Sequence, residues 1–407
     1  MWEYNGGMLG FGTHTKSVTY GAIIDVGSGT VGVGIVKSDY NKKLPEVIFS
    51  HRIEMRIADA DTNTPEDQMR RMREALFSAS LILSKDGLTA LHSLNPHAKI
   101  SRILVTCASP WAYTISKNVD YVHDSSLKIT PAFIHDLEQS AEDEIAKGME
   151  VFEESGSSDL KVVERATVDL KVNGYSVNDP VGLYGHEFSL SHIAGLVPKE
   201  VLDAVHEVQE KILTDTKISA HTYMLVIYCV LRDLFPKTDS LTIIDVTGES
   251  TEIGIVENGV LLESIHSRCG SNTLVREISE KTKGSHQDTI SSLQALAENT
   301  SSPQSIEALK LHLETYTQDL THTIESIHKN MNIPTTVVVT AQPAMRALFS
   351  TLAKDVLSNI TQTTPTVLEL DTKILDEVAL RNNQDIFIAI ASRFFHKLHG
   401  CGEIETL

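Results

Sequence analysis

The pattern of apolar and small polar residues in Gly21–Val36 occurs a second time in Leu241–Val256. In both stretches a β-branched run ends at an aspartate, a turn rich in Gly, Ser and Thr follows, and a second apolar run leads away. The run IIDV begins at residue 23 and again at residue 243, and the run GIV begins at 34 and again at 254, so both recur after 220 residues. This pattern predicts a β-hairpin, and its repetition predicts a chain built from two duplicated halves.

Between and after the two hairpins, strand and helix patterns alternate. Apolar residues at spacings of three and four predict a helix over 64–84, and short apolar runs predict buried strands at 102–106 and 336–340. Further helices are expected at 130–154, 198–213, 219–235, 342–357 and 385–398, with a broken polar helix over 288–327, and further strands at 46–54, 160–172 and 187–196. We therefore expect an α/β fold.

Length and charge narrow the function classes. The chain of 407 residues is long enough for two or three domains with their own cores. Its net charge of −19 repels phosphate backbones, so we expect no nucleic-acid partner. The four cysteines are scattered without CxxC spacing, which predicts neither a zinc site nor a disulfide framework. We expect a protein with reduced thiols, located in the cytoplasm or at the inner face of the cell membrane.

The two hairpin turns carry the residue types that bind phosphate. Glycines let backbone N–H groups approach a phosphate closely, and Ser and Thr hydroxyls donate hydrogen bonds to it. The candidate phosphate-binding residues are Asp25, Gly27, Ser28, Gly29 and Thr30 in the first copy, and Asp245, Gly248, Glu249, Ser250 and Thr251 in the second. Asp25 and Asp245, at the ends of their strands, are candidate ligands of Mg²⁺ through water. One copy alone is more typical of an ordinary glycine-rich hairpin than of a phosphate site, and the repetition favours phosphate binding.

Four segments together resemble the actin/Hsp70/hexokinase ATPase superfamily. Within it, the bacterial cell-division protein family FtsA is the most similar, and the pilus-assembly family PilM is second. The segments are the first loop Asp25–Thr30, the run Asn178–Gly185 (NDPVGLYG), the second loop Ile244–Ile255 and the helix entry Gly270–Leu274. The run NDPVGLYG favours FtsA over PilM, and the resemblance extends over about 20–400.

This resemblance implies an actin-like ATPase fold, with two duplicated mixed-sheet halves around a cleft and an inserted α/β subdomain. The implied boundaries are 20–99 for the first part of the N-terminal lobe, 100–211 for the FtsA-type insert and 212–400 for the C-terminal lobe, which includes a helical subdomain at about 272–333. Residues 1–19 and 401–407 are expected to be tails.

The sequence departs from the family at two nucleotide contacts. The second loop of the family reads Asp-x-Gly-Gly-Gly-Thr, whereas here only Gly248 remains and Glu249 places a carboxylate where a phosphate is expected. The glycines beside the adenine are replaced by Ala341 and Gln342, which follow Thr340. By resemblance, Gly270, Ser271, Thr340 and Ala341 complete the ATP site. We therefore expect ATP with Mg²⁺ to be a weak ligand and the protein to be at most a weak ATPase, with a pseudo-ATPase favoured.

The resemblance implies an adaptor in bacterial cell division. Such a protein links the FtsZ polymer to the membrane and the divisome, polymerises into filaments and uses ATP as an assembly ligand. A PilM-like scaffold of a type IV pilus machine, which binds a pilus inner-membrane protein, is the alternative. A small-molecule kinase of the same superfamily ranks lowest, because no catalytic residue is identified. A peripheral membrane contact, through the apolar helix at 385–398 or the first residues, stays open.

Overall fold

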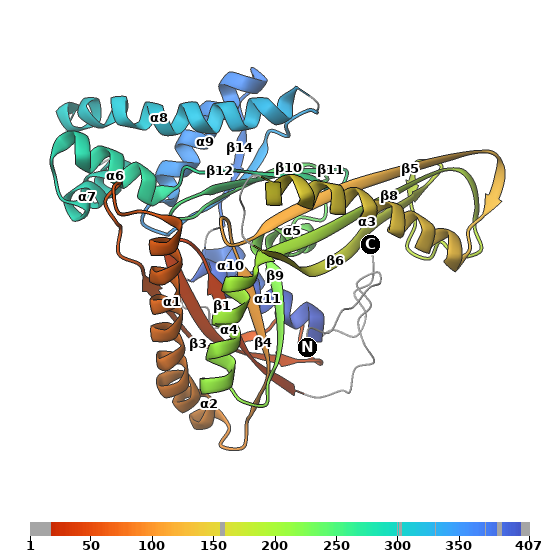
Figure 1. Ribbon diagram of the computed structural model, residues 1–407, viewed down its shortest axis with the longest axis horizontal. Coiled ribbons are helices and arrows are strands. Elements are labelled where there is room, and N and C mark those ends of the chain that lie inside the picture. Colours follow the sequence, from red (N-terminus) through yellow and green to blue (C-terminus); the bar gives the residue numbers. More distant parts are fainter. Residues whose placement is uncertain are drawn as a thin grey trace.

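Three β-sheets organise the chain (Figure 1). The computed structural model describes residues 18–154, 159–298, 300, 303–329, 331–370, 372–380 and 385–399. Sheet A has the strand order β3-β2-β1-β4-β9. Its strands are β1 (Val18–Val26), β2 (Thr30–Asp39), β3 (Glu46–Glu54), β4 (Ile100–Cys107) and β9 (Lys217–Thr222). Most of the two tails expected at 1–19 and 401–407 lies outside the described residues.

Sheet C repeats the topology of sheet A in the second half of the chain. Its order is β12-β11-β10-β13-β14. The strands are β10 (Leu241–Val246), β11 (Thr251–Glu257), β12 (Val260–Ser267), β13 (Thr336–Thr340) and β14 (Thr366–Leu368). In both sheets the first three strands pair antiparallel and the last two join in parallel, so the duplicated hairpins occupy equivalent places. The expectation of two mixed-sheet halves is confirmed.

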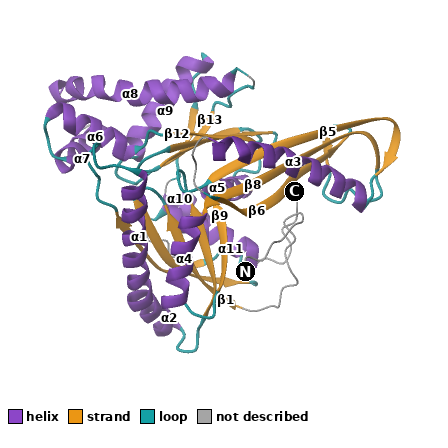
Figure 2. Ribbon diagram, viewed as in Figure 1, coloured by secondary structure: helices purple, strands orange, loops and turns teal. Residues whose placement is uncertain are grey.

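The first lobe is sheet A with helices on both faces, as the arrangement of strands inside and helices outside in Figure 2 shows. Because β1 is buried on both sides, its sequence is a nearly continuous apolar run. Ala22 and Ile24 face one core with α1, α2 and α4, whereas Ile23 faces a second core with α5 and α11. The helices are α1 (Pro65–Ile82), α2 (Leu88–Leu94), α4 (Lys199–Ile212), α5 (Tyr223–Leu234) and α11 (Ile386–His399), and a π-helical turn, Leu83–Gly87, joins α1 to α2.

The core around α5 joins the two lobes. Nine consecutive residues of this helix, Tyr223–Leu231, are buried, and they pack against both Ile23 of sheet A and Ile243 of sheet C. A helix that is apolar all round is typical of such an enclosed position. The second lobe is completed by α6 (Ser271–Thr282), α7 (His286–Ala297), α8 (Pro303–His328), α9 (Arg346–Thr361) and α10 (Thr372–Val378).

Sheet B and one helix form the insert, which extends to the right of Figure 1. Its order is β5-β8-β6-β7, and α3 covers one face. The elements are β5 (Tyr113–Lys128), α3 (Pro131–Glu154), β6 (Leu160–Val172), β7 (Tyr175–Ser176) and β8 (Tyr184–Pro198). The expected insert of 100–211 is longer than this unit: β4 pairs with β1, and α4 packs with α1, because their apolar residues complete the first lobe.

One predicted helix begins later than expected. Residues 217–222 form the edge strand β9 rather than the start of a helix over 219–235. Ile218 and Ala220 pack into the core of the first lobe, and Thr222 caps α5 by accepting a hydrogen bond from the amide of Leu225. None of the described helices is both long and apolar enough to cross a membrane.

Candidate functional site

The two predicted phosphate turns lie at the carboxyl ends of β1 and β10. In the first turn the amide of Gly27 donates to the carbonyl of Thr30 (3.0 Å), and in the second the amide of Thr247 donates to the carbonyl of Ser250 (2.9 Å). The central strands of the two sheets therefore present equivalent turns to each other, as the duplication predicts.

The two turns touch each other. A Cβ atom built on Gly248 lies 2.7 Å from both the Cα and the amide nitrogen of Gly29, which is too close for any side chain. Ser28 Oγ donates to Thr247 Oγ1 (2.9 Å) and accepts from the amide of Glu249 (2.8 Å). The hydroxyl of Ser28 and the amide of Glu249, both in the expected phosphate-binding loops, are thus engaged by the opposite turn.

The remaining residues of the second loop also have internal partners. Ser250 Oγ lies 2.8 Å from Ser109 Oγ and donates to the carbonyl of Ser267 (2.7 Å), while Thr251 Oγ1 donates to the carbonyl of Cys269 (2.7 Å). The helix entry is equally close to the turn. Ser271 Oγ donates to the carbonyl of Thr247 (3.1 Å), and a Cβ on Gly270 would lie 2.5 Å from the carbonyl oxygen of Gly248.

Asp25 and Asp245 occupy equivalent, buried positions. Each lies beside a threonine of the neighbouring parallel strand, since Asp25 pairs with Thr106 and Asp245 with Thr340. Thr106 Oγ1 donates to Asp25 (2.7 Å), and Thr340 Oγ1 donates to Asp245 (2.6 Å). The second carboxylate oxygen of Asp245 is buried and has no hydrogen-bond partner within the described part of the chain. Burial raises the pKa of Asp245 to about 7, against the hydrogen bond from Thr340.

Arg52 of β3 neutralises the first of these acids. Its Nη2 lies 2.9 Å from Asp25, its Nη1 donates to Thr30 Oγ1 (2.9 Å), and its Nε and Nη2 reach both carboxylate oxygens of Asp385 at 2.9 and 3.0 Å. The ring of Phe387 lies 4.7 Å from the guanidinium carbon. Burial lowers the pKa of Arg52, but Asp385 and Asp25 raise it by more, so the guanidinium remains charged.

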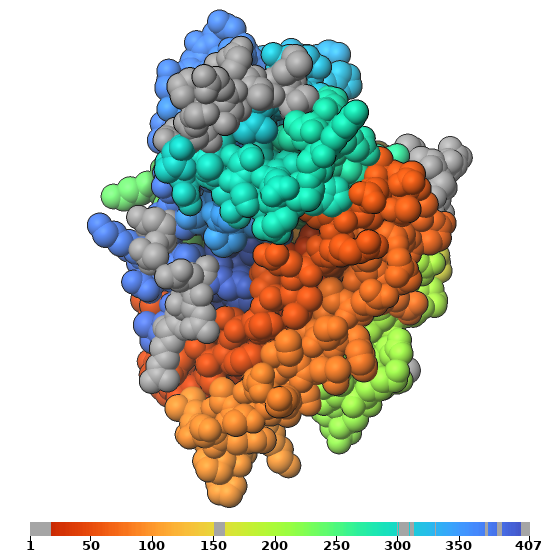
Figure 3. All heavy atoms as spheres, turned by 90° about the vertical axis from the view of Figure 1, so that its left-hand side faces the viewer, coloured from red at the N-terminus to blue at the C-terminus, as the bar shows by residue number. Residues whose placement is uncertain are grey.

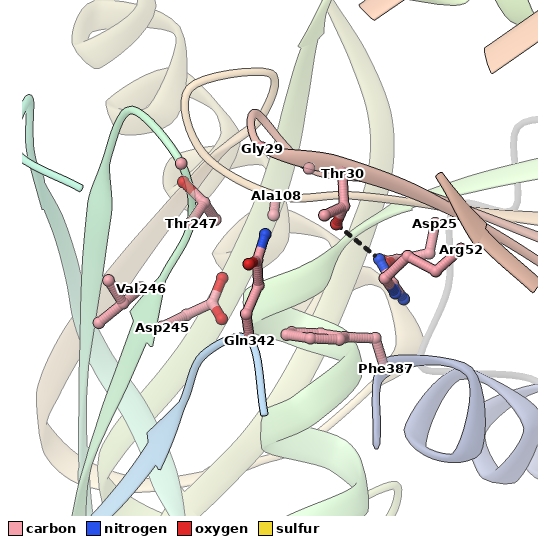
Figure 4. A pocket seen from close by; sticks show the side chains of 12 residues that line it. Asp25, Gly29, Thr30, Arg52, Ala108, Asp245, Val246, Thr247, Gln342 and Phe387 are labelled. Carbon is pink, nitrogen blue, oxygen red and sulfur yellow. Dashed lines mark hydrogen bonds and ion pairs between the residues drawn. The ribbon is translucent and has the colours of Figure 1, made fainter. Parts of the chain in front are cut away.

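The space that remains between the acids is small. The side chains of Asp245, Gln342 and Arg52 line the same cavity (Figure 4). The volume of this cavity that water can occupy is about 20 Å³. A single water needs at least about 10–15 Å³, so the cavity has room for one water but not for a phosphate chain. No three His, Cys, Asp or Glu side chains among the described residues lie close enough together to hold a metal ion.

Glu249 pairs with protein rather than facing an empty phosphate position. Its carboxylate lies 2.5 Å from Arg276 Nη2 and accepts from Asn272 (3.3 Å) and from Asn63 of the first lobe (3.1 Å). Arg276 in turn donates to the carbonyl of Ala58 (3.0 Å), which also belongs to the first lobe. Glu249 and Arg276 of the second lobe therefore bind residues of the first lobe and hold the two lobes together. On the face drawn in Figure 3, the teal surface of the second lobe lies directly against the orange surface of the first lobe.

The adenine-side residues lie at the floor of the same region. Thr340 donates its hydroxyl hydrogen bond to Asp245, and Ala341 is buried in the core of the second lobe. The side-chain amide of Gln342 lies beside Gly29. Sequence reasoning missed Arg52, Asp385, Phe387 and Arg276, which close the site. The alternation of β3 gave no signal for Arg52, because it places Arg52 on the same side of the strand as Ser50 and Glu54, opposite the apolar Phe49 and Ile53.

The contact between the turns yields a direct prediction. Gly248→Ala should lower the free energy of unfolding by about 1–3 kcal/mol, because the new methyl group forces two backbones apart. Chemical denaturation measures this change. Gly148→Ala is the matched control, since its Cβ meets only Ile115 at 3.7 Å and alanine favours the helix by up to about 1 kcal/mol. A Gly248→Ala protein as stable as the wild type would contradict the direct contact.

Comparison with solved structures identifies the fold. A chain in a structure of a PilM–PilN type IV pilus biogenesis complex matches with a TM-score of 0.55 and 11% identity, over 95% of this chain and 99% of that one. The ethanolamine utilization protein EutJ from Carboxydothermus hydrogenoformans matches with a TM-score of 0.42 and 10% identity, over 92% and 89% of the two chains.

A Bacteroides thetaiotaomicron protein with actin-like ATPase fold and unknown function matches with a TM-score of 0.43 and 11% identity, over 91% of this chain and 98% of that one. No family model and no curated protein matches the sequence. The expected actin-like ATPase fold is confirmed, whereas the narrower resemblance to FtsA is not shown.

Proposed function

We propose that this protein is a non-catalytic scaffold that uses an actin-like body to bind partner proteins. The observation that carries this proposal is the direct contact between the two turns, where Gly29 lies against Gly248 and Ser28 bonds to Thr247 and Glu249. A phosphate chain needs the same amides and hydroxyls. In this closed form, in which the two turns touch, hydrogen bonds between the lobes occupy groups that would otherwise bind phosphate.

ATP with Mg²⁺, expected from the sequence, does not fit the closed form. Asp25 is already neutralised by Arg52, whose positive charge repels a second cation placed beside it. Asp245 is buried with a pKa near 7, and the cavity beside it has room for about one water. Nucleotide binding thus requires the lobes to separate, which breaks the contacts that Glu249 and Arg276 make with the first lobe, and a cation at Asp25 requires Arg52 to move away.

Isothermal titration calorimetry tests this proposal. We expect no saturable heat when ATP is added with Mg²⁺ up to about 1 mM, which limits binding to less than about 4 kcal/mol. Injection of the same ATP and Mg²⁺ solution into buffer gives the heat of dilution, and ATP with EDTA in place of Mg²⁺ shows whether any binding needs the metal. Saturable binding with a Kd below about 1 mM would overturn the proposal, because it would show that the nucleotide opens the cleft on its own.

Within this class, we favour a scaffold of a type IV pilus machine, supported by the likeness in fold to the PilM–PilN complex. The partner would then be a pilus inner-membrane protein, and a short peptide from that protein should bind. The cell-division reading keeps its support from the run Asn178–Gly185 in the insert, and there the partner is an FtsZ polymer. Co-sedimentation with FtsZ filaments separates the two, and sedimentation of the protein alone reports self-association into filaments.

A further inference from the structure

Arg52 occupies a position that is built around its side chain. A Cβ atom on Gly32 of β2 would lie 2.5 Å from Nη2 of Arg52, so only glycine leaves room for the guanidinium there. The ring of Phe387 covers one face of the group. Asp25, Thr30 and Asp385 take up its N–H donors at 2.9–3.0 Å. The guanidinium of Arg52 thus binds Asp25 in the cleft, Thr30 in the first turn and Asp385 before α11.

Asp385 has a second task at the start of the last helix. Its Oδ1 accepts hydrogen bonds from the amides of Phe387 and Ile388, both at 3.1 Å, and its carbonyl accepts from Ala389 (2.9 Å). The amides of Phe387 and Ile388 are donors of the first turn that have no partner within the helix, so Asp385 is the N-terminal cap of α11. Here the chain has returned from sheet C, where β14 lies, to the face of sheet A that α11 covers.

We propose that Arg52 couples the cleft to the first turn of α11, as a lock that any ligand of Asp25 must release. A cation brought to Asp25 competes with Arg52 for the same carboxylate and repels it. When Arg52 moves, Asp385 loses its buried partner, and the first turn of α11 loosens. Conversely, weakening the contact between Arg52 and Asp385 loosens the turn around Thr30. This inference rests on the closed cleft of the proposed function, and it adds a regulatory role for Arg52.

Hydrogen exchange on the full chain tests the coupling in both directions. Asp385→Asn is the informative variant, since asparagine caps helices as well as aspartate but no longer attracts the guanidinium. We expect amide exchange in the turn at residues 27–30 to become about tenfold faster, as for a loss of about 1.4 kcal/mol in local stability. Arg52→Gln should speed exchange both there and at residues 387–390 of α11.

The matched control is Asp233→Asn. Asp233 of α5 holds the other end of α11 through Lys397, whose Nζ lies 2.9 Å from both carboxylate oxygens. This variant should speed exchange near Lys397 and leave residues 27–30 at the wild-type rate. Wild-type exchange at residues 27–30 in Asp385→Asn would overturn the coupling, and so would an equal effect of Asp233→Asn on that turn.

The hydrogen-exchange experiment tests the coupling separately from whether ATP binds. If calorimetry detects ATP and Asp385→Asn still loosens the turn, the scaffold proposal fails and the coupling stands. In that case ATP with Mg²⁺ should itself speed exchange at residues 387–390, because the ligand displaces Arg52. If calorimetry detects no ATP and the Asp385→Asn turn exchanges at the wild-type rate, the coupling fails and the scaffold proposal stands.

Discussion

Replacement of Arg52 by methionine should lower the free energy of unfolding by about 3–5 kcal/mol, the usual cost of removing one partner from a buried ion pair. Methionine keeps the unbranched stem of the side chain but removes the guanidinium, with its charge and its contact with Phe387. Asp25 and Asp385 then remain buried without their cation, and Thr30 loses a donor. A loss of this size is a large fraction of the stability of a typical domain.

Urea denaturation followed by circular dichroism measures this loss. Arg70→Met is the control, because Arg70 also contacts two acids, Asp67 and Glu74, but its side chain is 58% exposed. Exposed ion pairs of this kind contribute about 0–1 kcal/mol. Adding Asp25→Asn and Asp385→Asn to Arg52→Met should restore part of the stability, since the uncompensated charges are gone. Equal losses for Arg52→Met and Arg70→Met would show that Arg52 does not hold the cleft.

The duplicated halves could be predicted because their signal is local. Each hairpin is a short stretch whose β-branched strands and small turn are contiguous, and both parallel partners, β4 and β13, are plain apolar runs. The sequence predicted a helix over 219–222, the last four residues of the edge strand β9, because they precede a long apolar segment without a break in composition. The predicted limits of the insert also included β4 and α4, which belong to the first lobe. Their apolar residues do not show which sheet β4 joins or which sheet α4 packs against.

Only those parts of the candidate site that are formed by residues close together in the sequence could be predicted. The two turns and their aspartates were found, but the residues that close the cleft come from distant parts of the chain. Arg52 and Asp385 are 333 positions apart, and Arg276 reaches back 218 positions to Ala58. The sequence could show that Glu249 adds a negative charge to the second loop. It could not show that Arg276 is there to pair with it.

A row of polar groups, buried except for the half-buried His266 at its end, crosses sheet C from the cleft toward the insert. Thr340, Asp245, Glu252 and His266 lie directly opposite one another on four adjacent strands. Glu252 is buried, and Ser264 Oγ donates to its carboxyl group (2.7 Å). Burial raises the pKa of Glu252 to about 8, with a smaller contribution in the same direction from the charge of Asp245. The carboxyl group is therefore largely protonated near neutral pH.

The sign of the effect on stability follows from proton binding. Between the ordinary pKa of a glutamate, 4.5, and the raised value of about 8, the folded protein binds a proton at Glu252 that the unfolded chain has released. The free energy of unfolding must therefore fall as the pH rises through this interval and level off above it. A shift of this size corresponds to a fall of about 5 kcal/mol, and Asp245 adds a fall in the same direction between 3.8 and about 7.

Glu252→Gln should remove the part of this pH dependence that belongs to Glu252. Glutamine is neutral at every pH and can still accept the hydrogen bond from Ser264, so it copies the protonated carboxyl group. We expect the variant to match the wild type near pH 5 and to exceed its free energy of unfolding by several kcal/mol near pH 9. Denaturation curves at a series of pH values measure the difference. Glu257→Gln, at the half-exposed end of the same strand, is the control and should leave the pH profile unchanged. Parallel pH profiles for Glu252→Gln and the wild type would contradict this prediction, because they would mean that Glu252 is ionised in the folded protein.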